Sequence, residues 1–401
     1  MKRPTPSLDE QNTVTTELRL VALLSLPHLC PAQVHQAGLL EGTADFNRVS
    51  ELVTAHRIWP SVYCTLRDHL PHWLAKPSLG DLQSRYQINC IQSQRAFVIS
   101  GHLLRECRAQ HIPIKILKGA PLAFKLYGDI TKRHSSDIDL VVRQADLDAC
   151  RLILSRAGFQ CFDLHALSEA QTRAYWRTNK DIAYRNQAGV LVELHVRLSL
   201  QHFSITDRYL EALFDATPAS ERAHLELLYL CLHGIANYFH RLKWLIDIAL
   251  YLNLQTESSG QGLIRVARAK GAMRLLSASW VLANILFDTD LPEVVMAYYD
   301  QDILCQFAVR QCLRRLNHPR DRRSLQNQLK HLITEPFLYQ NTRECIGAVL
   351  IRFNPTVADI RKFNLPHRLY FLHYFMRPAL VIYRRVTQPR NSAPTKSTAL
   401  T

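Results

Sequence analysis

The 401-residue sequence predicts an α+β fold, in which a small mixed sheet is flanked by helical N-terminal and C-terminal regions. Apolar residues recur at helical spacing over residues 17–107 and again over 206–386. Between these regions, residues 108–205 contain short β-branched runs separated by glycines and polar turns, a pattern typical of strands. The polar ends, 1–16 and 387–401, are expected to be disordered. We therefore expect three structured regions between two tails.

Within the central region, apolar runs and glycines predict individual elements. Strands are expected over 112–117, 137–142, 159–164, 181–185 and 190–196. Helices are expected over 121–127 and 144–157, each followed by a glycine that suits a helix C-terminus, Gly128 and Gly158. The last two strands are expected to form a hairpin around residues 186–189.

Composition excludes several classes of protein. A hydrophobic content of 47% and a charged content of 21% are those of a globular chain. No run of eighteen apolar residues predicts a transmembrane helix, and the polar N-terminus lacks the apolar core of a signal peptide. The ten cysteines form no C-x-x-C pair, which argues against a zinc or redox site and favours a reducing cytoplasm.

The formal net charge of +15 is concentrated near the C-terminus, since residues 301–401 hold 17 Lys and Arg against 5 Asp and Glu. Such a field attracts phosphates on nucleotides, nucleic acid or lipid, although a solvated basic surface explains it equally well. Residues 366–385 combine basic and aromatic side chains. They predict either a helix that contacts an anionic membrane surface or a packed C-terminal helix kinked at Pro378.

Three carboxylates form a candidate metal site. Asp137 and Asp139 lie two residues apart on an expected strand, so both project from the same face. Glu193 lies on a second expected strand and approaches the aspartates if the two strands are neighbours. Neighbouring carboxylates repel unless a cation lies between them, and Mg²⁺ suits such a site. His195 and Arg197 share the face of Glu193, where His195 either orients the site or is a satisfied core histidine.

A candidate phosphate site precedes the aspartates. Lys118 and Gly119 stand before the helix over 121–127, where backbone N–H groups and a positive helix N-terminus favour phosphate. Arg133, in the polar turn that follows this helix, either reaches the same phosphates or is solvated.

These motifs together resemble the core of the DNA polymerase β-like nucleotidyltransferase superfamily. More specifically, the chain is similar to a poorly characterised bacterial nucleotidyltransferase family whose members occur among exopolysaccharide and lasso-peptide biosynthesis genes. The resemblance covers roughly residues 95–385. The matching stretches are 117–120, 126–127, Arg133, 136–142, 157–159, 192–197, 241–249 and 377–378.

The resemblance implies an enzyme that moves a nucleoside monophosphate from an NTP such as ATP to an unknown acceptor, in polysaccharide or peptide natural-product biosynthesis. It implies Mg²⁺ on Asp137, Asp139 and Glu193 as catalytic ligands. Nucleotide contacts are implied from a further set of residues, Lys118, Gly119, Arg133, Ser136 and Lys243.

One position departs from the pattern of the superfamily. Ala120 follows Gly119 where the superfamily usually has glycine or serine, so a hydroxyl that often contacts phosphate is absent. The alternative reading is therefore a catalytically inactive scaffold that binds nucleotide or nucleic acid. Under either reading the protein is expected in the cytoplasm, free or at a membrane surface.

Overall fold

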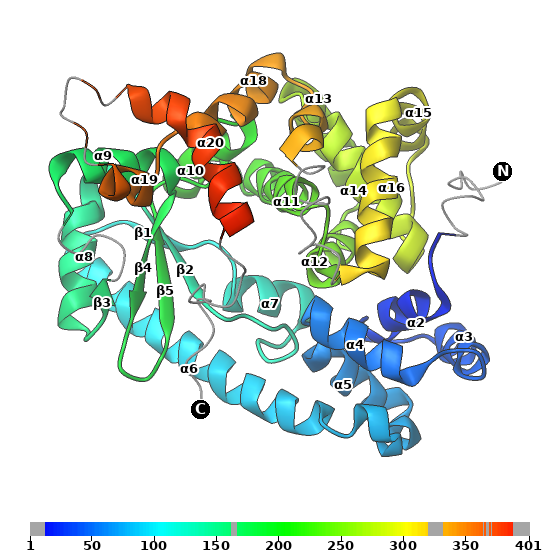
Figure 1. The fold of residues 1–401 in the computed structure, drawn as a ribbon. Coiled ribbons are helices and arrows are strands. Elements are labelled where there is room, and N and C mark those ends of the chain that lie inside the picture. Colours follow the sequence, from blue (N-terminus) through cyan, green and yellow to red (C-terminus); the bar gives the residue numbers. More distant parts are fainter. Residues whose placement is uncertain are drawn as a thin grey trace. The chain divides into compact units, whose positions relative to one another are not determined.

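The computed structural model describes residues 13–161, 167–319, 332–363, 365, 369 and 371–387 (Figure 1). The chain divides into two compact units, each built from separate stretches of sequence. The helical unit comprises the described residues within 1–99, 118–136 and 204–345. The sheet unit comprises those within 100–117, 137–203 and 346–401. The linear division expected from the sequence stays a prediction, because these units are defined by contacts and not by chain order.

The helical unit is built from amphipathic helices around buried leucines. Its α-helices are α2 (Thr16–Leu24), α3 (Pro31–Glu41), α4 (Phe46–His56), α5 (Trp59–His69), α7 (Ala120–Tyr127), α10 (Ser204–Phe214), α11 (Ala219–Ala236), α12 (Leu242–Asn253), α13 (Glu257–Ala269), α14 (Met273–Phe287), α15 (Glu293–Gln301) and α16 (Ile303–Asn317). Short 3₁₀ turns are η1 (Pro71–Ala75), η2 (Pro77–Leu79) and η5 (Glu335–Leu338). Two more helices, α6 (Leu82–Ala109) and α18 (Thr342–Leu350), each contribute residues to both units.

Local sequence explains where these helices begin and end. The Thr15 hydroxyl accepts a hydrogen bond from the Leu18 N–H and caps α2. Between α11 and α12, Tyr238 and Phe239 adopt positive φ of 46° and 42°, a conformation that helical residues do not have. The first helix therefore ends here and the second begins after it, so that His240 lies before α12 and Lys243 lies within it.

The sheet unit contains a five-stranded mixed sheet of order β1-β2-β5-β4-β3. Its strands are β1 (Ile114–Ile116), β2 (Ile138–Val142), β3 (Gln160–Cys161), β4 (Asp181–Arg185) and β5 (Leu191–His195). Strands β2 and β5 are parallel neighbours, and the other pairs are antiparallel. The unit also contains η3 (Gln144–Asp146), α8 (Leu147–Arg156), α9 (Glu169–Thr178), η6 (Ile351–Phe353), α19 (Val357–Lys362) and α20 (Leu372–Thr387).

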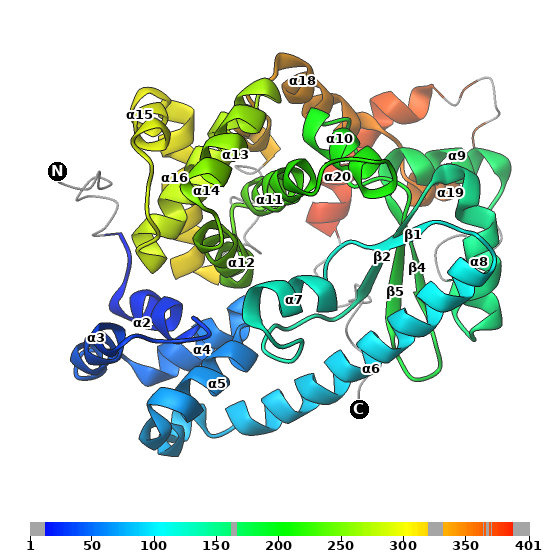
Figure 2. The same ribbon diagram turned by 180° about the vertical axis from the view of Figure 1, so that it is seen from behind.

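The alternation of side chains along β2, β4 and β5 gives the sheet two distinct faces. Ile138, Leu140, Val192, Leu194 and Ile182 are almost fully buried on one face, which forms the core of the unit. Helix α8 lies over this face, because Arg151 donates a hydrogen bond to the hydroxyl of Tyr184 on β4. Figure 2 shows the end of α6 in front of the strands and α8 beside them. The opposite face carries the polar residues of the candidate site.

The expected α+β class and four of the expected strands are confirmed, with small differences in their bounds, and the fifth, over 159–164, is β3 where it is described, while residues 162–164 lie outside the described residues. Asp137 was expected on a strand, but β2 begins one residue later, at Ile138. The helix expected over 144–157 is a 3₁₀ turn followed by α8. Gly128 and Gly158 have positive φ, as their expected places after helices require. The two expected tails lie largely outside the described residues, as do residues 366–368 of the expected basic segment.

Among the described residues, no helix is both long and apolar enough to cross a membrane. All ten cysteines are present as free thiols.

Candidate active site

The parallel pairing of β2 with β5 brings two of the predicted carboxylates together. In this ladder Asp139 lies directly opposite Glu193, so both side chains leave the same face of the sheet. Both are only partly exposed, with 18% and 13% of their side-chain surface accessible. The sequence prediction that Glu193 approaches the aspartate is therefore confirmed by strand register.

A histidine completes this cluster. His195 lies two residues beyond Glu193, is fully buried, and has its Nε2 atom 2.9 Å from Asp139 Oδ1 and 3.7 Å from Glu193 Oε2. One potential ligand atom from each of Asp139, Glu193 and His195 lies within 4.8 Å of the others. The carboxylate oxygens suit Mg²⁺, and their partial exposure leaves them reachable.

Two further polar residues of the cluster were missed by the sequence analysis. Asp181 lies opposite His195 on β4, with its Oδ2 atom 3.7 Å from His195 Nδ1. Lys180 precedes it, and its Nζ atom lies 3.2 Å from the same Nδ1. The strand that begins at Asp181 was predicted correctly. Alternation along it puts Asp181 on the face opposite the apolar Ile182, and this pattern could have identified Asp181 as a residue of the polar face.

Asp137 lies immediately before β2 and is partly exposed. Because it precedes the ladder, the strand alternation that was expected to align it with Asp139 does not apply. Its role as a third carboxylate stays a prediction.

The predicted phosphate residues Lys118 and Gly119 lie at the start of α7 in the helical unit. Gly119 is the residue before the helix and has φ 67° and ψ −130°, a conformation that L-amino acids rarely adopt. A Cβ atom at this position would meet only Ser135 Oγ, at 3.9 Å. Backbone conformation, and not lack of space, therefore requires glycine here. The Lys118 ammonium lies 4.7 Å from the centre of the Tyr229 ring, in cation–π range.

Arg133 and Lys243 are both buried and bound to protein groups. Arg133 donates two hydrogen bonds of 2.8 Å to the two oxygens of Asp247, and Tyr127 donates a third of 3.0 Å. Lys243, one helical turn before Asp247 on α12, donates to the carbonyl of His134. These contacts fix the turn that precedes β2. A direct role for Arg133 or Lys243 in nucleotide binding stays a prediction.

Burial in this region shifts two ionisation equilibria. Burial, followed by the charge of Asp247, raises the pKa of Tyr127 well above its usual value, so its hydroxyl remains a donor. Burial, followed by the charge of Lys243, lowers the pKa of His134 to about 2. His134 is therefore neutral at physiological pH. Its ring packs against that of Trp59, with 4.5 Å between the ring centres. Ser136, at the end of this turn, is exposed.

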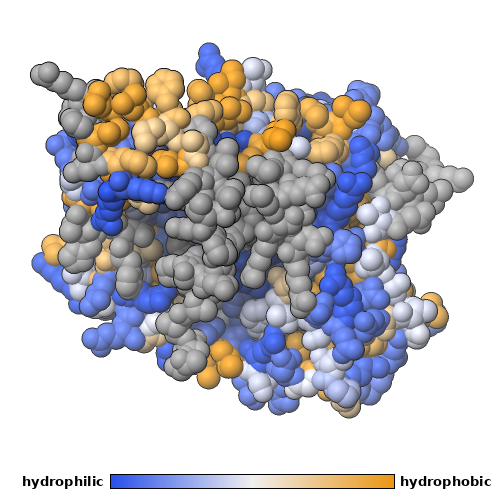
Figure 3. All heavy atoms as spheres, viewed as in Figure 1, coloured by the Kyte–Doolittle hydropathy of each residue, from blue (hydrophilic) through white to orange (hydrophobic). Residues whose placement is uncertain are grey.

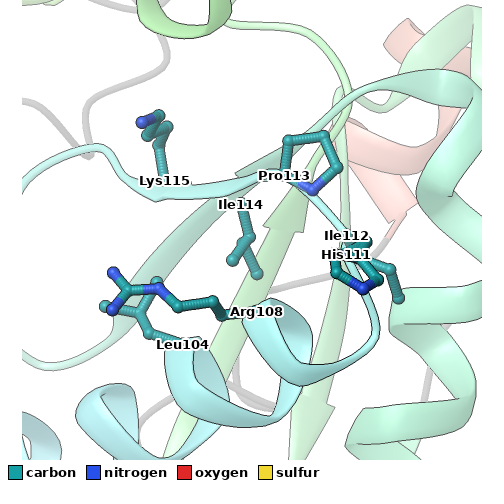
Figure 4. Close-up of a pocket in the computed structure, with 7 residues that line it drawn as sticks. All are labelled: Leu104, Arg108, His111, Ile112, Pro113, Ile114 and Lys115. Atoms are coloured by element: carbon teal, nitrogen blue, oxygen red, sulfur yellow. The ribbon is translucent and has the colours of Figure 1, made fainter.

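A pocket of about 330 Å³ lies elsewhere in the sheet unit, between the end of α6 and β1 (Figure 4). Its apolar lining includes Leu104 and Ile114, and Arg108, His111 and Lys115 add basic groups. None of the predicted site residues lines this pocket, so it is separate in composition from the carboxylate cluster.

The fold and site define an α+β protein whose small mixed sheet carries a carboxylate cluster on one face. The chain belongs to the uncharacterised nucleotidyltransferase family, whose model matches residues 42–288, more than half of its length. The match includes α7, β2 and β5, and with them every residue predicted for the site. No curated protein and no solved structure matches the chain. The protein is therefore a nucleotidyltransferase, an enzyme of nucleotide transfer.

Proposed function

We propose that the protein is a Mg²⁺-dependent enzyme that transfers a nucleoside monophosphate from an NTP to the hydroxyl or phosphate of an acceptor, in polysaccharide or peptide natural-product biosynthesis. The observation that carries this proposal is the pairing of Asp139 with Glu193 on adjacent parallel strands. Two carboxylates aligned on one face, with ligand atoms within 4.8 Å, fit a hard divalent cation that prefers oxygen ligands.

The proposal gives each carboxylate a role. Asp137, Asp139 and Glu193 hold Mg²⁺, which when bound neutralises the charge of the phosphates. Glu193 accepts the proton of the acceptor hydroxyl as the acceptor oxygen bonds to the α-phosphorus and pyrophosphate leaves. Positioning and charge stabilisation supply most of the rate enhancement in such transfers.

The nucleotide contacts are proposed from charge and backbone geometry. Lys118 provides a positive point charge for the triphosphate, and backbone N–H groups in the first turn of α7, after Gly119, donate to a phosphate oxygen. Ser136 offers an exposed hydroxyl. Arg133 and Lys243 contribute positive potential through their buried positions around the turn before β2.

The test is incubation of the purified protein with each NTP, Mg²⁺ and fractionated cell lysate. The NTP is labelled in parallel reactions on the α-phosphate or the γ-phosphate. We expect α-label to enter a protein, lipid, glycan or RNA fraction, pyrophosphate to be released, and both signals to vanish in Asp139→Asn. Transfer of γ-label alone would show phosphoryl transfer and refute the proposal.

A nucleotide-binding scaffold without catalysis is the second candidate, favoured by Ala120 at the first position of α7. Titration calorimetry with Mg²⁺ and each NTP separates the two candidates. Heat of binding without turnover supports the scaffold. If the missing hydroxyl limits the enzyme, Ala120→Ser tightens NTP binding or raises turnover above that of the wild type.

We also propose that the C-terminal part of the sheet unit contacts an anionic membrane surface from the cytoplasm. Phe371, just before α20, and Phe375, in its first turn, are 55% and 76% exposed, and Figure 3 shows hydrophobic side chains gathered near the start of this helix, along the upper edge of the face. The basic excess beyond residue 301 complements anionic lipid. We expect the full chain to sediment with vesicles containing phosphatidylserine but not with pure phosphatidylcholine. Phe371→Asp/Phe375→Asp abolishes this, and Leu39→Asp, at an exposed apolar residue of the helical unit, does not.

A further inference from the structure

The ring of His195 is held at both of its nitrogens. Nε2 lies 2.9 Å from Asp139 Oδ1, and Nδ1 lies 3.2 Å from the Nζ atom of Lys180. Both distances fall within the range of hydrogen bonds. The side chain is only 1% exposed, so protein groups and not solvent determine which nitrogen carries the proton.

The chemistry of Lys180 decides the direction of both hydrogen bonds. An ammonium group has three donors and no acceptor, so Nδ1 of His195 must accept. The ring proton therefore lies on Nε2, which donates to Asp139. Asp181 is the competing partner of Nδ1, but its Oδ2 atom is 3.7 Å away, beyond hydrogen-bond length.

A nitrogen that carries a proton has no lone pair for a metal ion. We propose that Lys180 locks His195 in the Nε2–H form, so that His195 positions Asp139 and is excluded as a metal ligand. The cluster then presents carboxylate oxygens alone, the ligands that Mg²⁺ and Mn²⁺ prefer, and disfavours Zn²⁺ and Co²⁺, which bind imidazole well. This inference rests on the proposed role of the carboxylates in metal binding. Lys180 and His195 are thus positioning residues that set metal selectivity.

The backbone around Lys180 is fixed by two contacts within the sheet unit. Arg197 donates to the carbonyls of Trp176 and Asn179, the latter at 2.9 Å, and so ties the end of α9 to the segment after β5. The Lys180 carbonyl accepts from the Val196 N–H at 3.3 Å. The lysine therefore enters the cluster from an anchored position.

Removing the Lys180 ammonium moves the preferred position of the His195 ring proton from Nε2 to Nδ1. In Lys180→Met, no donor faces Nδ1, and Asp181 becomes the nearest polar partner. A carboxylate next to Nδ1 favours a proton on that nitrogen, as in the carboxylate–histidine pairs that support metal-bound imidazoles. Nε2 is then free to bind a metal together with Asp139 and Glu193, which form one cluster with it.

The test measures affinities of the full chain for Zn²⁺ and Mn²⁺ by titration calorimetry. Changes in groups that support metal ligands alter affinity by about 10- to 100-fold. We expect Lys180→Met to raise the ratio of Zn²⁺ to Mn²⁺ affinity by about this factor, and Lys180→Met/His195→Gln to restore the wild-type ratio. Lys115→Met, at an exposed lysine of the same unit, controls for lost charge. Loss of charge alone strengthens the binding of both cations and leaves the ratio unchanged.

Co²⁺ absorption provides a second reading, because a nitrogen ligand changes the visible spectrum of the ion. We expect this change in Lys180→Met and not in the wild type. An unchanged affinity ratio in Lys180→Met, or a His195-dependent nitrogen ligand in the wild type, overturns the inference. If the wild type and Lys180→Met show the expected affinity ratios but the wild type transfers no nucleotide, the proposed function fails and this inference stands.

Discussion

The pair formed by Arg133 and Asp247 makes a quantitative prediction about stability. The two side chains are 5% and 1% exposed, and two hydrogen bonds of 2.8 Å join them. Asp247→Asn keeps the shape of the side chain and an oxygen that accepts from Tyr127, but it removes the negative charge. The variant leaves the Arg133 charge buried without its counter-ion.

Loss of one partner of a buried ion pair costs about 3–5 kcal/mol. For a folding unit of about 150–250 residues, which is close to the size of the helical unit, each kcal/mol lowers the melting temperature by about 2–4 °C, so Asp247→Asn should melt about 6–20 °C below the wild type. The double variant Arg133→Met/Asp247→Leu should recover part of this loss, because apolar residues of similar size often replace a buried pair without cost, while the buried Tyr127 hydroxyl loses its acceptor.

Circular dichroism at pH 7 measures both variants against a matched control. Asp148→Asn breaks a pair with Arg151 in which the aspartate is 89% exposed, and it should cost about 1 kcal/mol or less. The reasoning is refuted if Asp247→Asn melts within 2 °C of the wild type, or if the double variant is no more stable than the single one.

Three further predictions concern the site and the response to pH. Asp139→Asn should abolish turnover without lowering the melting temperature of the metal-free protein, since it relieves repulsion with Glu193; turnover at the wild-type rate would remove Asp139 from the site. Lys118→Ala should weaken NTP binding by about ten- to a hundredfold, because a charged contact contributes about 1.5–3 kcal/mol; an unchanged dissociation constant in calorimetry would contradict this. Burial lowers the pKa of His56 to about 4, below its ordinary value of 6.5. The unfolded chain therefore binds more protons between these values, and stability present above pH 6.5 falls by about 3 kcal/mol as the pH drops to 4. Urea unfolding at pH 7 and pH 4 should show a loss about 3 kcal/mol smaller in His56→Gln than in the wild type, because His134, with its pKa of about 2, adds the same loss to both.

The sequence predicted that Asp139 and Glu193 lie close together because two local patterns were sufficient. Alternation along each strand placed Asp139 and Glu193 opposite their apolar neighbours. Both strands form, and their parallel register aligns the two residues. The functional family followed from motifs within a short stretch of chain, and the family match over residues 42–288 confirms it.

The remaining contacts depended on distances along the chain that local patterns do not encode. Arg133 and Asp247 are 114 residues apart, and nothing in either neighbourhood shows that they meet. Asp181 reaches His195 only through the register of β4 with β5, where a slip of one residue would turn Asp181 to the other face, and Lys180 is brought to His195 by its place just before this strand.

The discontinuity of the two units bears on how the protein is made. A ribosome releases the chain from its N-terminus, and a nascent chain that ends at residue 203 already carries all five strands. Its partners are still to be synthesised: the Asn354 side chain donates to the carbonyl of Arg177, 177 residues earlier, and α19 packs on α9. Contacts between residues so far apart in the sequence form slowly, because a long loop must close, at a cost in entropy, before the contact stabilises the chain. The apolar surface of the strands therefore stays exposed during synthesis. The sheet unit can be completed only after α19 and the segment around Asn354 have left the ribosome.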